Sequence, residues 1–237
     1  MKTIRFKLTF IDQILATTPG NEEIYSDYIA SKAFDVKTKV EDPKDEKQVA
    51  AAKKEARENT DEEKEMLHNM LDSMDEIEKG TTFFFKDENG NPYIYSYWLY
   101  GFFKSACSAL KKVPDTLSSK IKAYKKEIDL LFKVFPDASD KSTRHIKLEN
   151  YGELGMCERP LRAQTMQGER VALSRSESAQ PGTTIEFDVV LLRDTDEDVL
   201  MEWMDYGVFN GLGQWRNSGK GAFQYEVIAK DGKAVKK

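Results

Sequence analysis

The chain has 237 residues, of which 40% are hydrophobic and 32% are charged, and its formal net charge is −5. We expect one domain over residues 1–237, large enough to bury a core and interrupted by insertions. The sequence has no run of 18 apolar residues and no signal-peptide pattern, so we expect a cytoplasmic protein without a membrane segment. Two cysteines and two histidines provide neither a disulfide framework nor a zinc-site spacing, and we expect no metal and no cofactor.

The acidic residues are concentrated in one segment of the chain. Residues 41–79 contain fourteen acidic and seven basic residues, a net charge of −7, so the rest of the chain carries +2. The total charge therefore does not exclude an anionic partner, because association depends on the field of the surface that meets the ligand.

The first third of the chain contains one clear strand and one long insertion. Apolar and polar side chains alternate over residues 3–11, which predicts a strand with one face in the core. Pro19 is a breaker before a helical pattern that extends to residue 35. Residues 36–80 are rich in Ala, Glu and Lys and predict an acidic helical insertion. Both a solubilising surface insertion and a partner-docking arm are compatible with this composition.

The middle of the chain predicts a hairpin, two helices and a strand. Residues 81–97 contain two β-rich runs around Asp-Glu-Asn-Gly-Asn-Pro, which indicates a hairpin. Ser96 can cap the next helix, whose wide apolar face is typical of a core helix. A second helix is predicted at about residues 116–129, and residues 130–137 are predicted to form a strand.

The last part of the chain begins with a long polar excursion over residues 140–182, which contains short strand-like pieces. A strong strand is predicted at residues 183–192, and a helix with an acidic start at residues 193–209. A final strand is predicted at residues 222–229. Without the insertions, the order is strand, helix, strand, strand, helix, strand. This order predicts an α+β fold with a ferredoxin-like β-α-β-β-α-β core, which is also the architecture of RNA-recognition modules.

The segment "GLGQWRNSGKG", residues 211–221, holds four of the fourteen glycines and connects the second core helix to the last strand. Glycine permits positive φ and a close approach of the backbone to a ligand, and successive N–H groups can form an anion-binding nest. Arg216 and Lys220 would contact phosphate, and Trp215 would stack on a base. A tight turn at the end of a helix is the alternative. The predicted nucleic-acid contacts in this loop are Gly211, Gly213, Trp215, Arg216, Asn217, Ser218, Gly219, Lys220 and Gly221.

The pattern G-x-G-x5-G-x-G between the last helix and the last strand resembles the glycine-rich loop of the RAMP superfamily, the repeat-associated proteins of CRISPR systems. Residues 92–106 are similar to the segment that opens the first helix of its guide-RNA backbone subunits. Leu99 and Gly101 match that segment, and Lys104 replaces its arginine. The family's lysine before the helix glycine is Tyr100 here, which is a departure from its pattern.

Residues 157–192 are similar to the family's hairpin, which begins at an acidic-arginine pair, here Glu158 and Arg159, and continues through a Pro-Gly-Thr turn into a core strand. The resemblance implies binding of single-stranded RNA along a groove formed by the helix start, a β-hairpin thumb within residues 140–182 and the glycine loop. It also implies head-to-tail assembly. Stand-alone members of the superfamily encoded in bacteriophage genomes are similar as well. Outside the loop, the candidate nucleic-acid-binding residues are Lys104, Arg159, Arg162, Arg170 and Arg175.

Two groups of basic residues have alternative interpretations. The arginines of the hairpin could instead form salt bridges with nearby glutamates. A basic run, with Lys120, Lys122, Lys125 and Lys126, could be a solvated helix face or could extend an electrostatic track for a polyanion.

Catalytic candidates are few. Some RAMP proteins cleave RNA with a histidine or with an aspartate in the loop after the first strand, and His145 and Asp35 are the weak candidates here. Asp12 and Asp27 are further candidates by position, and His68 is interpreted as a surface residue.

The sequence therefore predicts a non-catalytic protein that binds single-stranded RNA or DNA, and the resemblance favours RNA as the ligand. We expect a homo-oligomer or a subunit of a ribonucleoprotein. The alternatives are a RAMP-type endoribonuclease and a protein-binding mimic of a CRISPR backbone subunit.

Overall fold

The computed structural model describes residues 1–19, 81–165 and 168–235. The helix predicted after Pro19, the acidic insertion, Asp27, Asp35 and His68 lie outside the described residues. The chain divides into two units, which are taken one at a time. Unit 1 contains Met1–Ala16, Phe84–Met156 and the residues from Glu177 onward. The described residues of unit 2 are 17–19, 81–83, 157–165 and 168–176.

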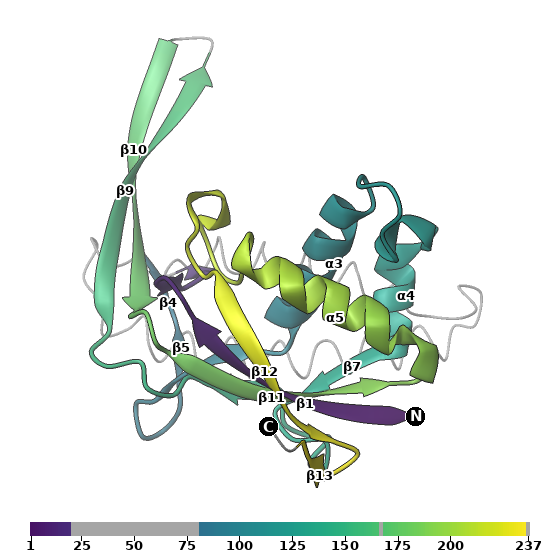
Figure 1. Cartoon of the computed structure of the whole chain (residues 1–237). Coiled ribbons are helices and arrows are strands. Elements are labelled where there is room, and N and C mark those ends of the chain that lie inside the picture. The colour runs from purple at the N-terminus through teal and green to yellow at the C-terminus, as the bar shows by residue number, and fades with distance from the viewer. Residues whose placement is uncertain (20–80, 166–167, 236–237) are drawn as a thin grey trace, which may run out of the picture. The chain divides into compact units, whose positions relative to one another are not determined.

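A five-stranded antiparallel sheet with the order β13-β12-β1-β11-β7 forms the centre of unit 1 (Figure 1). In chain order its strands are β1 (Lys2–Phe10), β7 (Phe132–Phe135), β11 (Thr184–Leu191), β12 (Phe223–Lys230) and β13 (Lys233–Ala234). The register pairs Lys2 with Leu191 and Phe10 with Phe223, so β1 lies between two strands that come much later in the chain. These strands confirm the predictions for residues 3–11, 130–137, 183–192 and 222–229.

Helices cover one face of this sheet. The α-helices of unit 1 are α3 (Tyr97–Leu110), α4 (Tyr124–Leu131) and α5 (Glu197–Asp205). Short 3-10 helices are η2 (Ser118–Lys120), η3 (Asp194–Asp196), η4 (Tyr206–Val208) and η5 (Arg216–Ser218). Ser96 precedes α3 as predicted, but its side chain makes no capping hydrogen bond, because its backbone already has helical φ and ψ.

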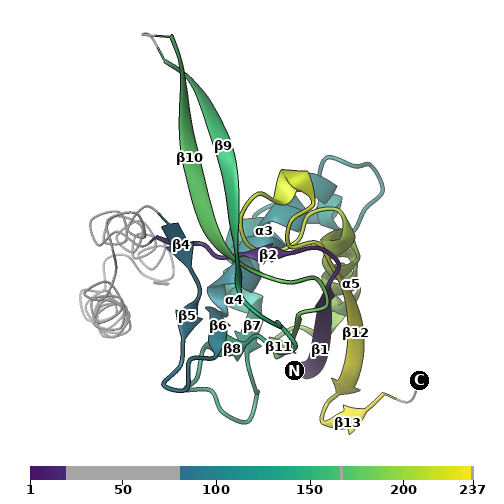
Figure 2. The same ribbon diagram turned by 90° about the vertical axis from the view of Figure 1, so that its left-hand side faces the viewer.

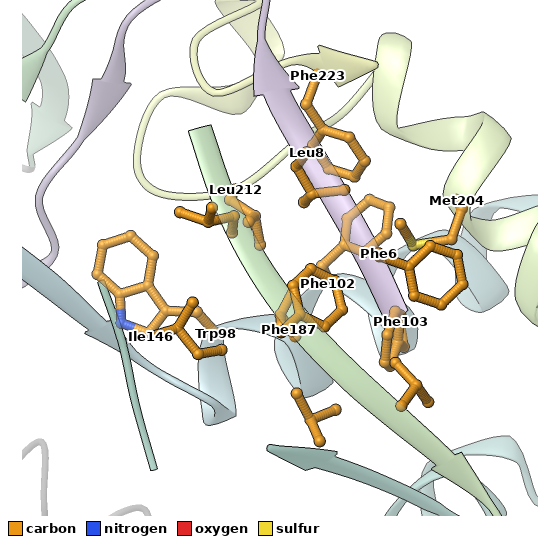
Figure 3. Close-up of a cluster of buried hydrophobic side chains, with 14 of the residues drawn as sticks. Phe6, Leu8, Trp98, Phe102, Phe103, Ile146, Phe187, Met204, Leu212 and Phe223 are labelled. Atoms are coloured by element: carbon orange, nitrogen blue, oxygen red, sulfur yellow. The ribbon is translucent and has the colours of Figure 1, made fainter. Parts of the chain in front are cut away.

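The core lies between the sheet and the helices (Figure 3). The alternation predicted for the first strand is confirmed, since Ile4, Phe6, Leu8 and Phe10 are all at most 1% exposed. From the helices, Trp98, Phe102 and Phe103 of α3 and Met204 of α5 pack against these side chains. Each fully buried side chain of this size contributes about 1.5–3 kcal/mol of transfer free energy.

The helix predicted at about residues 116–129 begins later, at Tyr124. The Glu202 carboxylate accepts hydrogen bonds from the backbone amides of Leu117 and Ser118, at 2.6 and 3.0 Å. Ser118 also donates its hydroxyl to Glu202 at 2.6 Å and accepts from Trp203 Nε1 at 2.9 Å. These partners hold the segment before α4 in a separate turn, and sequence periodicity does not reveal them.

A three-stranded sheet with the order β5-β6-β8 forms the second sheet of unit 1. Its strands are β5 (Phe85–Lys86), β6 (Pro92–Tyr95) and β8 (His145–Lys147). The pairing of β5 with β6 confirms the predicted hairpin. Because β8 pairs with β6, residues 145–147 are part of a sheet, and only a later portion of the polar excursion forms a separate hairpin.

That hairpin consists of β9 (Gly155–Thr165) and β10 (Gly168–Ala179), which pair with each other (Figure 2). In unit 2, β10 pairs in parallel with β4 (Thr81–Phe83), and β4 pairs with β3 (Thr18–Pro19). In unit 1, the end of β10 pairs with β2 (Ile14–Leu15). The predicted α+β class is confirmed. None of the helices in the described part of the chain is long and apolar enough to cross a membrane.

Candidate nucleic-acid interface

The glycine loop, residues 211–221, is held against the segment that follows β1. The amide of Gly221 donates to the Gln13 carbonyl at 2.8 Å, and the amide of Gln214 donates to the Leu15 carbonyl at 3.4 Å. Leu212 donates to the Gly221 carbonyl at 3.0 Å, which closes the base of the loop. Several amides of the predicted anion nest therefore already have carbonyl partners within the protein.

Close packing explains why glycine occupies both ends of the loop. A Cβ atom on Gly211 would lie 1.6 Å from the backbone oxygen of Gly221, and one on Gly221 would lie 1.7 Å from the backbone oxygen of Leu212. Gly219 is different, since it has a φ of +83° and no atom lies within 4 Å of the position of its Cβ. The alternative of a tight turn thus accounts for Gly211 and Gly221, while Gly219 faces open space.

Two side chains at the tip of the loop are at least partly exposed. Trp215 has a left-handed backbone, with φ of 55° and ψ of 36°, and is 40% exposed. Arg216 follows it and is half-buried, and within the described residues its guanidinium has neither an ion pair nor a hydrogen bond. Asn217 and Ser218 are exposed beside them. An exposed indole next to an unpaired guanidinium offers a stacking face and a bidentate phosphate donor.

The structure places Asp12, at the end of β1, against Lys220 of the loop. The Lys220 ammonium is 3.0 and 3.2 Å from the two oxygens of the Asp12 carboxylate. Burial raises the pKa of Asp12, but hydrogen bonds from Lys220 and from the Gln13 amide outweigh it and hold that pKa below its usual value. Lys220 therefore meets a protein carboxylate in the absence of ligand. From the sequence, Asp12 was only a catalytic candidate by its position after the first strand. Its pairing with Lys220 could not be predicted, because 208 residues separate the two.

Phe209 is a candidate that the sequence analysis did not single out. It follows η4, immediately before the loop, and is 76% exposed, while its ring lies 6.2 Å from that of Tyr206. Single exposed apolar side chains are common on protein surfaces, so Phe209 is a candidate because of its place beside the loop. In the sequence, the only feature that points to Phe209 is its place just before Asn210 and Gly211, where the loop begins.

Other predicted contacts already have protein partners. Lys104 forms an ion pair with Asp129 of α4 at 2.8 Å. In unit 2, Arg175 pairs with Glu158 at 2.7 Å, as the salt-bridge alternative for the hairpin expects, and Arg159 is 7% exposed. Arg162 lies in β9 and Arg170 lies in β10, but their side chains are outside the described part.

His145, the weak catalytic candidate, belongs to the three-stranded sheet of unit 1. Its ring stacks on Tyr93 at 4.4 Å and meets Tyr95 edge-on at 4.8 Å. It lines a recess of about 300 Å³, whose other lining residues are Arg5, Pro136, Asp137, Asp140, Thr143, Lys147, Glu149 and Glu186. Four carboxylates outnumber the two permanent cations there, which disfavours entry of a phosphodiester.

The open face of the main sheet is occupied by charge pairs. Arg5 lies 3.6 Å from Asp188, and Lys7 lies 3.5 Å from Glu186. Phe135 is covered by the Arg144 guanidinium at 4.8 Å from its ring. RNA-recognition modules stack bases on aromatic side chains of the sheet. The described strands offer no exposed aromatic for this purpose, so the glycine loop is the better candidate site.

Comparisons with known proteins give likenesses of structure alone. No protein-family model and no curated protein matches the chain. A chain of the type III-B Cmr-beta bound to cognate target RNA, solved by cryo-EM, is similar with a TM-score of 0.47 and 10% identity, and the match covers 97% of this chain and 60% of that one. A chain of a type IV-B CRISPR complex is similar with a TM-score of 0.42 and 10% identity, over 100% of this chain and 93% of that one. At this identity, neither comparison assigns a role to any residue.

Proposed function

We propose that this protein binds single-stranded nucleic acid, RNA in preference to DNA, through the glycine loop. The observation that carries the proposal is the group formed by an exposed Trp215, the guanidinium of Arg216, which has no partner among the described residues, and the nearby ammonium of Lys220. Stacking on an indole and charge-assisted contacts to phosphate are the two interactions by which proteins hold single strands without reading their sequence. Phe209 adds a second exposed ring beside the loop.

The strand order supports a ferredoxin-like core. The connection from β1 through α3 to β7 leaves β11 between the two strands, and the connection from β11 through α5 to β12 leaves β1 between them. Two such split β-α-β units define the predicted architecture. Together with the glycine-loop pattern, this arrangement supports a RAMP-type protein of one domain over residues 1–237, in which the β9–β10 hairpin is the thumb and copies of the protein assemble along the ligand.

Fluorescence anisotropy with labelled single-stranded RNA and DNA of about thirty nucleotides tests the proposal. Arg216→Ala removes one phosphate contact, so it should weaken binding. The fall of log affinity with log salt concentration should become less steep by about 0.7. Trp215→Ala should cost about 1–3 kcal/mol of binding free energy through lost stacking. Lys141→Ala, a change of an exposed cation outside the loop, is the control. Absence of binding to either strand at low salt would refute the proposal.

An endoribonuclease is the second candidate, and the position of Asp12 favours it over the other catalytic options. The carboxylate lies after β1 and against the glycine loop, where a bound strand would pass. Incubation of RNA with wild type and with Asp12→Asn distinguishes the two functions. Cleavage that is lost in the variant supports the enzyme, and intact RNA in both samples supports a binding protein.

A further inference from the structure

A group of exposed lysines follows the end of α3. We name it the lysine patch, and it consists of Lys112, Lys120, Lys122, Lys125 and Lys126. Lys125 and Lys126 lie in the first turn of α4, and Lys122 lies just before its N-cap, Ala123. Lys111 joins the two ends of the patch, because its ammonium donates to the carbonyls of Ile121 and Lys122 at 2.7 and 3.1 Å.

Two carboxylates of α4 are engaged elsewhere, since Glu127 pairs with Arg193 at 3.4 Å and Asp129 pairs with Lys104 at 2.8 Å. Glu202 accepts the amides of Leu117 and Ser118 where η2 begins. Asp115, which is exposed, is the one acidic residue among residues 111–126. Within the described residues, no ion pair or hydrogen bond engages the side chain of any lysine in the patch. Like charges on neighbouring side chains repel one another, and a bound polyanion would relieve that repulsion.

α3 connects the surroundings of the glycine loop to the segment that carries the patch. Asn210, immediately before the loop, has its Nδ2 atom 3.5 Å from Ser105 Oγ on α3. Lys111, whose ammonium binds the segment of the patch, is six residues beyond Ser105, and a helical rise of about 1.5 Å per residue separates these two residues by about 9 Å along the helix axis. Both surfaces belong to unit 1, on the side of the sheet that the helices cover (Figure 1). A strand long enough to follow α3 from the loop would reach the patch.

We infer that the lysine patch is a second phosphate-contact surface, which extends the path of a single-stranded nucleic acid beyond the glycine loop. The inference rests on the proposed function for the identity of the ligand. Lysine ammonium groups on flexible stems are point charges, so they add affinity and salt dependence without reading sequence.

The test compares labelled RNA of about six and about thirty nucleotides, because a short strand fills the loop alone and a long strand reaches the patch. The patch variant is Lys125→Gln with Lys126→Gln. The matched control is Lys141→Gln with Lys233→Gln, which removes the same charge from two exposed lysines elsewhere. Circular dichroism of each variant checks that the fold is retained.

For the long strand, we expect the patch variant to bind about three- to tenfold more weakly than the control, with a salt slope lower by about 1.4 for two lost contacts. The six-nucleotide strand should bind both variants equally. Equal binding of the long strand to patch variant and control overturns the inference. If Arg216→Ala leaves affinity unchanged while the patch variant weakens it, the glycine-loop site fails and the patch stands.

A polyglutamate peptide provides the last arm, because exposed Val113 and Leu117 in the same segment would also suit a protein partner. Failure of the peptide to displace long RNA from wild type, at equal charge concentration, supports a nucleic-acid ligand. Tight binding of the peptide that is lost in the patch variant, without RNA binding, would identify an acidic protein surface as the occupant and overturn the inference.

Discussion

Replacement of Asp12 by asparagine should strengthen nucleic-acid binding. In the free protein, the Asp12 carboxylate holds the Lys220 ammonium at 3.0 Å, so a phosphate group must compete with it for the same cation. Asparagine has the same shape but no charge. The substitution therefore releases Lys220 and removes one negative charge from the path of the strand.

The expected gain in affinity follows from how exposed the Lys220–Asp12 ion pair is. The side chains of Lys220 and Asp12 are 19% and 39% exposed, and a partly exposed pair of this kind has a net strength of about 0.2–1 kcal/mol. If that free energy returns to binding, the dissociation constant falls by a factor of about 1.5 to 5, since about 1.4 kcal/mol is tenfold. The fall of log affinity with log salt concentration should become steeper by up to about 0.7 for one added phosphate contact.

Fluorescence anisotropy with single-stranded RNA measures both quantities, and Glu153→Gln removes the same charge from an exposed position as a control. Affinity for Asp12→Asn that equals or falls below that of the control would show that Lys220 does not compete for phosphate. The same variant should be less stable than wild type at neutral pH. Because the folded state lowers the pKa of Asp12 from 3.8, its contribution to stability is present above that value and is lost as the pH falls through the lowered pKa. Thermal unfolding curves of both proteins at low pH should converge.

Three other predictions concern the scaffold. Gly211→Ala should cost about 3 kcal/mol or more of unfolding free energy, because its Cβ meets a backbone oxygen, whereas Gly219→Ala should cost about 1–2 kcal/mol from its positive φ alone. Urea denaturation of the two variants separates close packing from backbone strain, and equal losses would contradict this explanation. Ser118→Ala should cost about 1–3 kcal/mol, since it leaves the buried indole N–H of Trp203 without its acceptor, and tryptophan fluorescence in urea reports the change. Hydrogen bonds led by the Asn91 amide lower the pKa of Asp87 to about 2, so NMR titration should show its carboxyl ionised at pH 3, and its contribution to stability should be lost only as the pH falls from 3.8 through about 2. An unshifted titration would show that the turn does not hold the carboxylate.

The strands of the core could be predicted from the sequence because each has a clear periodic pattern. The alternation around Phe6 and the apolar run around Phe187 both correspond to strands whose apolar faces are buried. The start of α4 could not be predicted, since the hydrogen bonds of Glu202 to the preceding segment join residues more than eighty positions apart. The strand-like piece predicted at residues 144–149 corresponds to β8, but its pairing with β6 could not be predicted, because it depends on a partner about fifty residues earlier in the chain.

The glycines and basic residues of the sequence indicated where the candidate site lies, but the contacts within that site could not be predicted. The pattern of glycines places Trp215 and Arg216 in a loop, and in the structure Trp215 is exposed and Arg216 is half-buried. The pairing of Lys220 with Asp12 and the exposure of Phe209 required the fold, because both depend on how the loop packs against the segment after β1.

The central position of β1 sets an order of events during synthesis. Its partners begin at Thr184 in β11 and Phe223 in β12, so the strand leaves the ribosome long before either neighbour exists. At about 5–20 residues per second, the 189 residues between Lys2 and Leu191 take roughly 10–40 s to translate. Throughout this interval the apolar face of β1 has no sheet to join, and it is a natural binding site for chaperones on the nascent chain.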